Sequence, residues 1–182
     1  MTETPIHRSL FTQTLDPQKV FRQRMQLKGQ LPVASLQRLC ESLLDEEGTV
    51  IADLLFEVDT ERRPRIIGKV STNVSVVCQR CLQPMLLNVE DKIDLVLVTT
   101  DAQSKALPDR LDPWMCGEDE LLSPADIIEE QLILAMPIVS MHERCVDVNK
   151  AQDLAIQKQI ESESARKNPF AALVGLKSRS EK

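Results

Sequence analysis

Three segments in the middle of the chain alternate apolar and polar side chains with a period of two residues, namely 50–58, 68–77 and 85–98. This is the repeat of a β-strand with one buried face, whereas a helix would need apolar residues three or four positions apart. Only one face of each strand is apolar, and the connections between the strands are short. The pattern therefore favours hairpins in an antiparallel sheet that covers a core on one side.

Two further segments have apolar residues at helical spacing and are expected to back this sheet, residues 33–44 and 125–136. The second follows Ser123 and Pro124, a combination of N-cap residue and first-turn proline that commonly opens a helix. An additional strand is expected over 25–31. The sequence thus predicts an α+β domain with an antiparallel sheet of about four or five strands backed by helices.

The remaining segments before the tail are shorter. Asp16 followed by Pro17 predicts a short helix that continues through Arg24. Residues 99–117 contain two prolines and no sustained period, so they are expected to form a loop, and residues 120–122 resemble a strand.

The chain becomes polar after Cys145, and a short apolar cluster at 168–177 then interrupts a basic tail. We expect a single α+β domain over 1–146, followed by a polar tether and flexible tail over 147–182. The cluster is predicted to dock on a partner, because its apolar anchors have a groove-binding spacing and carry a cationic flank. The anchors are Phe170, Leu173, Val174 and Leu176, and the flank is Arg166, Lys167 and Lys177.

Charge is distributed unevenly along the chain, whose net charge is −6. Residues 1–38 carry six bases and two acids (+4), residues 39–148 nine bases and 22 acids (−13), and residues 149–182 seven bases and four acids (+3). The acidic body should repel phosphate, while the basic ends can contact it. Four Phe, one Trp and no Tyr are too few for a stacking surface that binds single-stranded RNA.

No run approaches the 18 consecutive apolar residues of a membrane span. The N-terminus lacks the apolar stretch and cleavage site of a signal peptide. A cytoplasmic protein without a membrane partner is expected.

Cysteine spacing gives the most specific chemical motif. Cys78 and Cys81 form a CxxC between two predicted strands, where both thiolates can reach one tetrahedral ion. His142 and Cys145 form an HxxC just after the predicted helix, so one structural zinc with a Cys₃His ligand set is a candidate cofactor. The alternative of reduced surface thiols without metal stays open at this point.

The other two cysteines are excluded from this set, because Cys40 falls on an apolar helix face and Cys116 in an isolated loop. A thioredoxin-like site would need its CxxC at the start of a helix after a strand, which the predicted hairpin does not provide. No glycine-rich phosphate loop is present, and acidic pairs such as Glu129 and Glu130 are expected to be solvated. An enzyme with a small-molecule substrate is therefore not expected.

Three blocks of the sequence resemble the YceD family of large ribosomal RNA subunit accumulation proteins. They are VVCQRCLQPM at 76–85, DIIEEQLILAMPIVSMHERC at 126–145 and KNPFAALVGLK at 167–177, and LDPQKVFRQRMQLKGQLP at 15–32 is similar to the start of the family. Their order and spacing match over nearly the whole chain.

This resemblance implies a non-enzymatic factor for the synthesis, processing or stability of 23S rRNA, and hence for the large ribosomal subunit. Its expected partners are a ribosomal protein, rRNA or a large-subunit assembly intermediate, and it brings no catalytic residues to this chain. The alternative from another class is a thiol-dependent redox enzyme, or a small zinc-binding adaptor, that uses Cys78 and Cys81.

Overall fold

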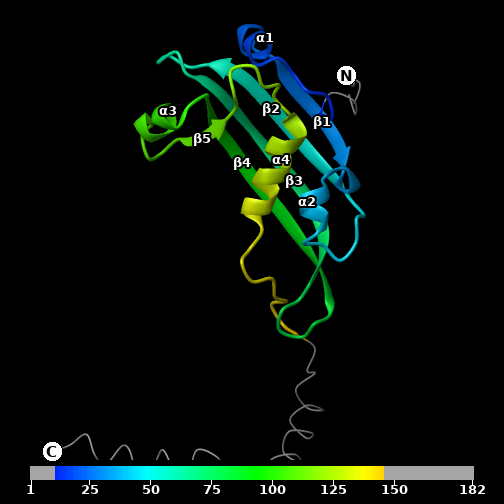
Figure 1. Ribbon diagram of the computed structural model, residues 1–182. Helices are drawn as coiled ribbons and strands as arrows, with labels where there is room; N and C mark the ends of the chain where they lie inside the picture. Colours follow the sequence, from blue (N-terminus) through cyan, green and yellow to red (C-terminus); the bar gives the residue numbers. More distant parts are fainter. Residues whose placement is uncertain (1–10, 146–182) are drawn as a thin grey trace, which may run out of the picture. The chain divides into compact units, whose positions relative to one another are not determined.

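The computed structural model describes residues 11–145, and its centre is a five-stranded sheet with the order β1-β2-β3-β4-β5 (Figure 1). The strands are β1 Gln26–Pro32, β2 Thr49–Val58, β3 Pro64–Val77, β4 Pro84–Val98 and β5 Asp112–Met115. β1 to β4 pair with their sequence neighbours in antiparallel fashion. The predicted α+β class is confirmed.

Short helices accompany the sheet: α1 Pro17–Arg22, the 3₁₀ helix η1 Val33–Ser35, α2 Gln37–Cys40, α3 Asp101–Ala106 and α4 Pro124–Ala135. The two predicted N-caps are present, because the Asp16 side chain accepts the Lys19 N–H and the Ser123 side chain accepts the Asp126 N–H. Within residues 11–145, no helix is long and apolar enough to cross a membrane.

The apolar face of the sheet packs against α4, which lies across β3 and β4 (Figure 1). Alternate residues of the strands are buried there, as the period-two pattern predicts; Val70 and Val74 of β3 are examples. Ile128 and Leu132 of α4 are fully buried in the same core. This packing fixes the position of the C-terminal end of α4 relative to the sheet. It therefore also fixes the point in the fold from which the following segment starts.

The edge strand β5 differs from the expected arrangement, because it pairs with β4 in parallel and makes the sheet mixed. The prediction of a loop over 99–117 is wrong for two parts of that range, α3 and β5. α3 lies between β4 and β5, so the chain re-enters the sheet edge in the direction of β4. A strand of four residues is too short to show an alternation of apolar and polar side chains, so β5 has no signal in the sequence. Its Pro113 is tolerated because β5 is an edge strand of the sheet.

The predicted helix over 33–44 is also wrong in its extent, because it is reduced to η1 and one turn of α2. Leu36 separates the two with a backbone that is not helical, at φ −108° and ψ 84°. α2 begins where the Glu129 carboxylate accepts the N–H groups of Arg38 and Leu39. Glu129 is therefore buried rather than solvated, which corrects a second expectation from the sequence.

The strand-like residues 120–122 contribute one isolated bridge, between Leu122 and Leu15. The predicted domain boundary after residue 146 stays a prediction, because it and the tether and tail over 147–182 lie outside the described residues.

Candidate metal centre

The loop between β3 and β4 holds the CxxC motif in a tight turn. The Cys78 N–H donates to the Gln83 carbonyl at 3.0 Å, and the Leu82 N–H donates to the Cys78 carbonyl at 2.9 Å. Leu82 adopts a left-handed backbone with φ +59°, which allows the chain to reverse within six residues. As a result, Cys78 and Cys81 lie in one short loop at the tip of the hairpin.

The segment after α4 runs to this hairpin tip, as Figure 1 shows in yellow to orange. The Gln79 N–H donates to the carbonyl of Ser140 at 2.9 Å. The Arg80 guanidinium donates to the carbonyl of His142 at 2.8 Å. These two bonds join residues about sixty positions apart and bring His142 to the CxxC loop.

Four thiol and imidazole groups meet at this point: Cys78, Cys81, His142 and Cys145, here named the tip cluster. One ligand atom from each lies within 4.8 Å of the other three. The Cys81 Sγ lies 3.4 Å from the Nδ1 of His142, and the His142 backbone N–H donates to the Cys78 Sγ at 3.4 Å. Cys78 is buried, and the other three are half-buried.

The surroundings of Cys78 favour its thiolate. Burial is the largest single effect and raises the pKa of this thiol. The backbone N–H groups of Cys81, His142 and Arg80 point at the sulfur and together outweigh burial, so the pKa falls from 9.0 to about 5. Metal coordination requires the thiolate form, which this arrangement stabilises before any ion is bound.

The donor set fits zinc. Zn²⁺ in structural sites takes four Cys or His ligands in a tetrahedron. At a Zn–S distance of about 2.3 Å, two ligand atoms on such a tetrahedron lie roughly 3.8 Å apart. The tip cluster meets this requirement after small adjustments, since all its ligand atoms lie within 4.8 Å of one another.

The two remaining cysteines lie elsewhere in the fold. The Cys40 Sγ contacts the Val33 carbonyl at 3.3 Å, and the Cys116 Sγ contacts the Glu120 carbonyl at 3.6 Å. Burial raises the pKa of both thiols, so they stay protonated at neutral pH. Neither belongs to the tip cluster.

The family was identified by comparison with known proteins. Residues 66–177 match the family model described as large ribosomal RNA subunit accumulation protein YceD. A curated relative of that name from Haemophilus influenzae is 30% identical over an alignment of 171 residues, which covers 90% of this chain and 94% of the relative. The chain belongs to the YceD family. The resemblance found in the sequence blocks is thus confirmed, whereas no solved structure matches the chain.

The YceD match includes the whole tip cluster and the predicted docking residues of the tail, Phe170, Leu173, Val174, Leu176, Lys167 and Lys177. These tail residues lie outside the described part of the chain. The names of the YceD family and of its Haemophilus relative refer to accumulation of the large ribosomal RNA subunit, and they state no catalytic activity.

Sequence reasoning missed two residues that assemble the tip cluster. Arg80 occupies a variable position of the CxxC, and Ser140 is a buried residue in the segment after α4. Arg80 acts through its side chain and Ser140 through its backbone carbonyl, and neither role has a sequence signature. The short mixed segment between Pro137 and Cys145 has no periodicity from which its path could be predicted.

Proposed function

We propose that this protein is a non-enzymatic cytoplasmic factor that acts by binding during the synthesis, processing or stabilisation of 23S rRNA. Its role in the accumulation of the large-subunit rRNA follows from its family. Binding rather than catalysis is supported by the chemistry of the described residues. His142 is the only histidine among residues 11–145, and its ring lies against Cys81 within a cluster of three Cys and one His, which is the ligand set of a structural metal site.

The observation that carries this proposal is an exposed apolar surface next to the tip cluster. It lines a hollow of about 740 Å³ between the hairpin tip, the turn after α2 and the end of α4. Leu82 is 72% exposed and Ile138 is 97% exposed, and Val77 and Leu134 border the same hollow. Exposed apolar groups gathered in this way are typical of surfaces that bind another macromolecule.

The proposal includes one structural zinc ion on Cys78, Cys81, His142 and Cys145. Zinc with four protein ligands has no open coordination position, so its contribution would be to hold the hairpin tip against the segment after α4. The ion would thereby fix the apolar surface to which the hairpin tip contributes Leu82 and the segment after α4 contributes Ile138.

The tail forms the second part of the proposed binding machinery. Phe170, Leu173, Val174 and Leu176 are the apolar anchors, and Arg166, Lys167 and Lys177 supply positive charge. Such a segment suits a groove on an RNA-rich particle, where cations contact phosphate and the anchors contact protein. The proposed partners are a ribosomal protein, rRNA or a large-subunit assembly intermediate.

Deletion of the gene tests the proposal directly. We expect less 23S rRNA relative to 16S rRNA, and fewer large subunits in sucrose gradients. Complementation should succeed with the parent chain and with Cys40→Ser, and should fail or weaken with Cys81→Ser. Normal 23S rRNA amounts and normal gradients in the deletion strain would overturn the proposal.

A thiol-dependent redox enzyme is the second candidate, favoured by the low pKa of Cys78 beside Cys81. Two features count against it, since Cys78 is buried and the CxxC joins two strands instead of opening a helix. A disulfide-reductase assay separates the candidates. Turnover by the reduced chain that is lost in Cys78→Ser supports the enzyme, and its absence supports the binding factor.

A further inference from the structure

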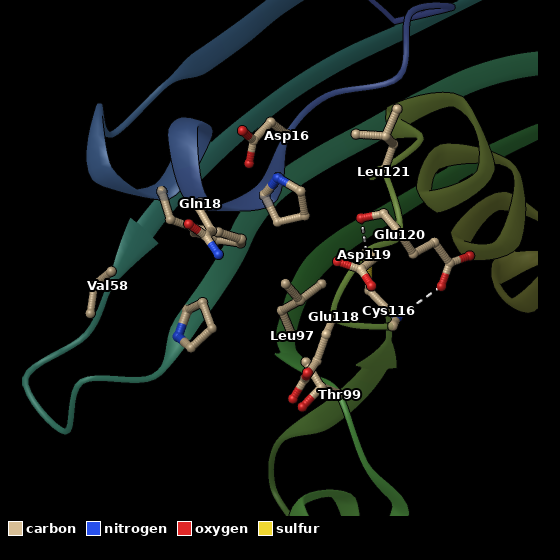
Figure 2. A pocket seen from close by; sticks show the side chains of 14 residues that line it. Asp16, Gln18, Val58, Leu97, Thr99, Cys116, Glu118, Asp119, Glu120 and Leu121 are labelled. Atoms are coloured by element: carbon tan, nitrogen blue, oxygen red, sulfur yellow. Dashed lines mark hydrogen bonds between the residues drawn. The ribbon is translucent and has the colours of Figure 1, made fainter.

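A second concave surface lies at the opposite end of the sheet from the hairpin tip. It has a volume of about 790 Å³ and is bordered by α1, by the adjoining ends of β2, β3 and β4, and by residues 116–121 after β5 (Figure 2). Its apolar lining includes Phe21, Val58, Pro64 and Leu97. We name this surface the acidic cleft because of the charges described next.

Four carboxylates border the acidic cleft, and no Lys, Arg or His of residues 11–145 lines it. In Figure 2, Asp16, the N-cap residue of α1, lies on one side, and Glu118, Asp119 and Glu120 come from the loop on the other. The cleft therefore combines an apolar floor with a strongly negative rim.

The four carboxylates divide into two that support the fold and two that do not. Asp16 caps α1 by accepting the Lys19 N–H at 3.3 Å, and Glu120 accepts the Gly117 N–H at 2.8 Å. Glu118 and Asp119 are exposed, and they form no hydrogen bond or ion pair with other residues of the 11–145 region. These two carboxylates can accept cationic groups from a partner without disturbing local structure.

The combination selects one class of ligand. A phosphate backbone is repelled by the rim, and the −13 charge of residues 39–148 strengthens that repulsion. Lys and Arg side chains suit both parts of the surface, because their aliphatic stems cover apolar groups while their cationic heads reach carboxylates. Neighbouring apolar side chains of the same ligand would fill the floor between Val58 and Leu97.

We propose that the acidic cleft binds a basic segment of a partner protein in which Lys or Arg residues alternate with apolar residues. If the proposed function is correct, this partner is a protein of large-subunit assembly; the binding chemistry of the cleft does not depend on that function. In this proposal, the acidic middle part of the chain recognises a protein, and the basic ends of the chain contact rRNA phosphate. A competing occupant is the chain's own N-terminal segment, since residues 1–10 include His7 and Arg8 and lead into Phe11.

The test uses the full-length chain and a fluorescein-labelled twelve-residue peptide of alternating Lys and Leu, with binding followed by anisotropy at low salt. Charge is removed from the rim in Glu118→Gln/Asp119→Asn, and the matched control is Glu46→Gln/Glu47→Gln on the exposed turn after α2. We expect the rim variant to bind about tenfold more weakly, because it loses two exposed ion pairs. The control should bind like the parent.

Two further arms isolate the cleft. Val58→Ser should weaken binding severalfold, since Val58 lines the floor and is 50% exposed. A single-stranded RNA dodecamer should not compete with the peptide. Equal weakening in the rim variant and the control would mean that only net charge matters, and effective competition by RNA would assign the cleft to nucleic acid. Either result overturns the proposal.

The N-terminal segment is tested by deleting residues 2–10. Binding that appears only after this deletion would assign the cleft to the chain's own segment and overturn the proposal, whereas unchanged binding supports it. The peptide assay measures binding to the acidic cleft alone, whereas the amount of 23S rRNA in a deletion strain tests the proposed function. The two proposals can therefore fail separately.

Discussion

The carboxylate of Glu129 in α4 accepts the backbone N–H of Leu39 in α2 at 3.2 Å, and the same oxygen accepts the Arg38 N–H at 2.8 Å. One buried side chain thus caps a helix ninety residues earlier in the sequence. This contact holds α2 against α4, and the end of α4 in turn positions the segment that carries His142.

Replacement of Glu129 should therefore destabilise the fold. Glu129→Ala leaves two backbone N–H groups without an acceptor and should lower the free energy of unfolding by about 1–3 kcal/mol. Glu129→Gln keeps one acceptor oxygen and should cost clearly less. Glu130→Ala is the control, because within residues 11–145 Glu130 forms only an exposed ion pair with Arg38. Urea unfolding measures all three, and equal effects of Glu129→Ala and Glu130→Ala would contradict the assigned role.

Stability should depend on pH through Asp59 in the turn between β2 and β3. The N–H of Arg63, then the Arg63 guanidinium and the N–H of Glu61, donate to this carboxylate and lower its pKa despite some burial. A lowered pKa in the folded state means that the carboxylate stabilises the fold above its unfolded-state pKa of about 3.9. This contribution is lost as the pH falls through the lower folded-state pKa.

Asp59→Asn tests this prediction by urea unfolding between pH 2 and pH 7, a range of about 5 pH units that spans the ordinary carboxyl pKa. The difference in stability between parent and variant should be largest at the neutral end and should shrink toward the acidic end. Asp109→Asn, in the loop between α3 and β5, serves as the control and should change little. A difference that stays constant with pH would indicate a packing effect instead.

Purified protein should contain about one zinc ion per chain, since the tip cluster supplies one tetrahedral ligand set. Cys81→Ser should lower the zinc content, while Cys40→Ser should leave it unchanged. Chelation should lower the melting temperature by about 3 °C for each kcal/mol of binding free energy lost. Elemental analysis that finds well under one zinc per chain in the parent would remove the metal from the proposal.

The tail should act in binding and not in folding. Phe170→Ala should weaken association with large-subunit assembly intermediates by about 2 kcal/mol or more, as expected for a buried anchor. Its melting temperature should equal that of the parent and of the control Ser180→Ala. Co-sedimentation in sucrose gradients measures the association. If deletion of 168–182 instead lowers the melting temperature and leaves co-sedimentation intact, the tail is part of the folded core.

Local patterns predicted the elements whose cause is local. The period-two alternation placed Val70 and Val74 on the buried face of β3, because successive side chains of a strand point to opposite sides. Asp16 and Ser123 cap helices through contacts with residues three positions ahead, so the signal and the structure lie in the same few residues. The sequence by itself therefore determined the main strands, the capped helices and the α+β class.

Tertiary structure decided the features that depend on distant partners. The role of Glu129 required α2 to lie beside α4, and the direction of β5 required α3 to carry the chain along the edge of β4. The spacing of Cys78 and Cys81 indicated one half of a metal-ligand set. It did not indicate which residues about sixty positions later would lie beside these two thiols. Packing of α4 on the sheet and the bonds to Ser140 and His142 decide that placement, because contacts between distant segments are set by the fold of the backbone and not by sequence spacing.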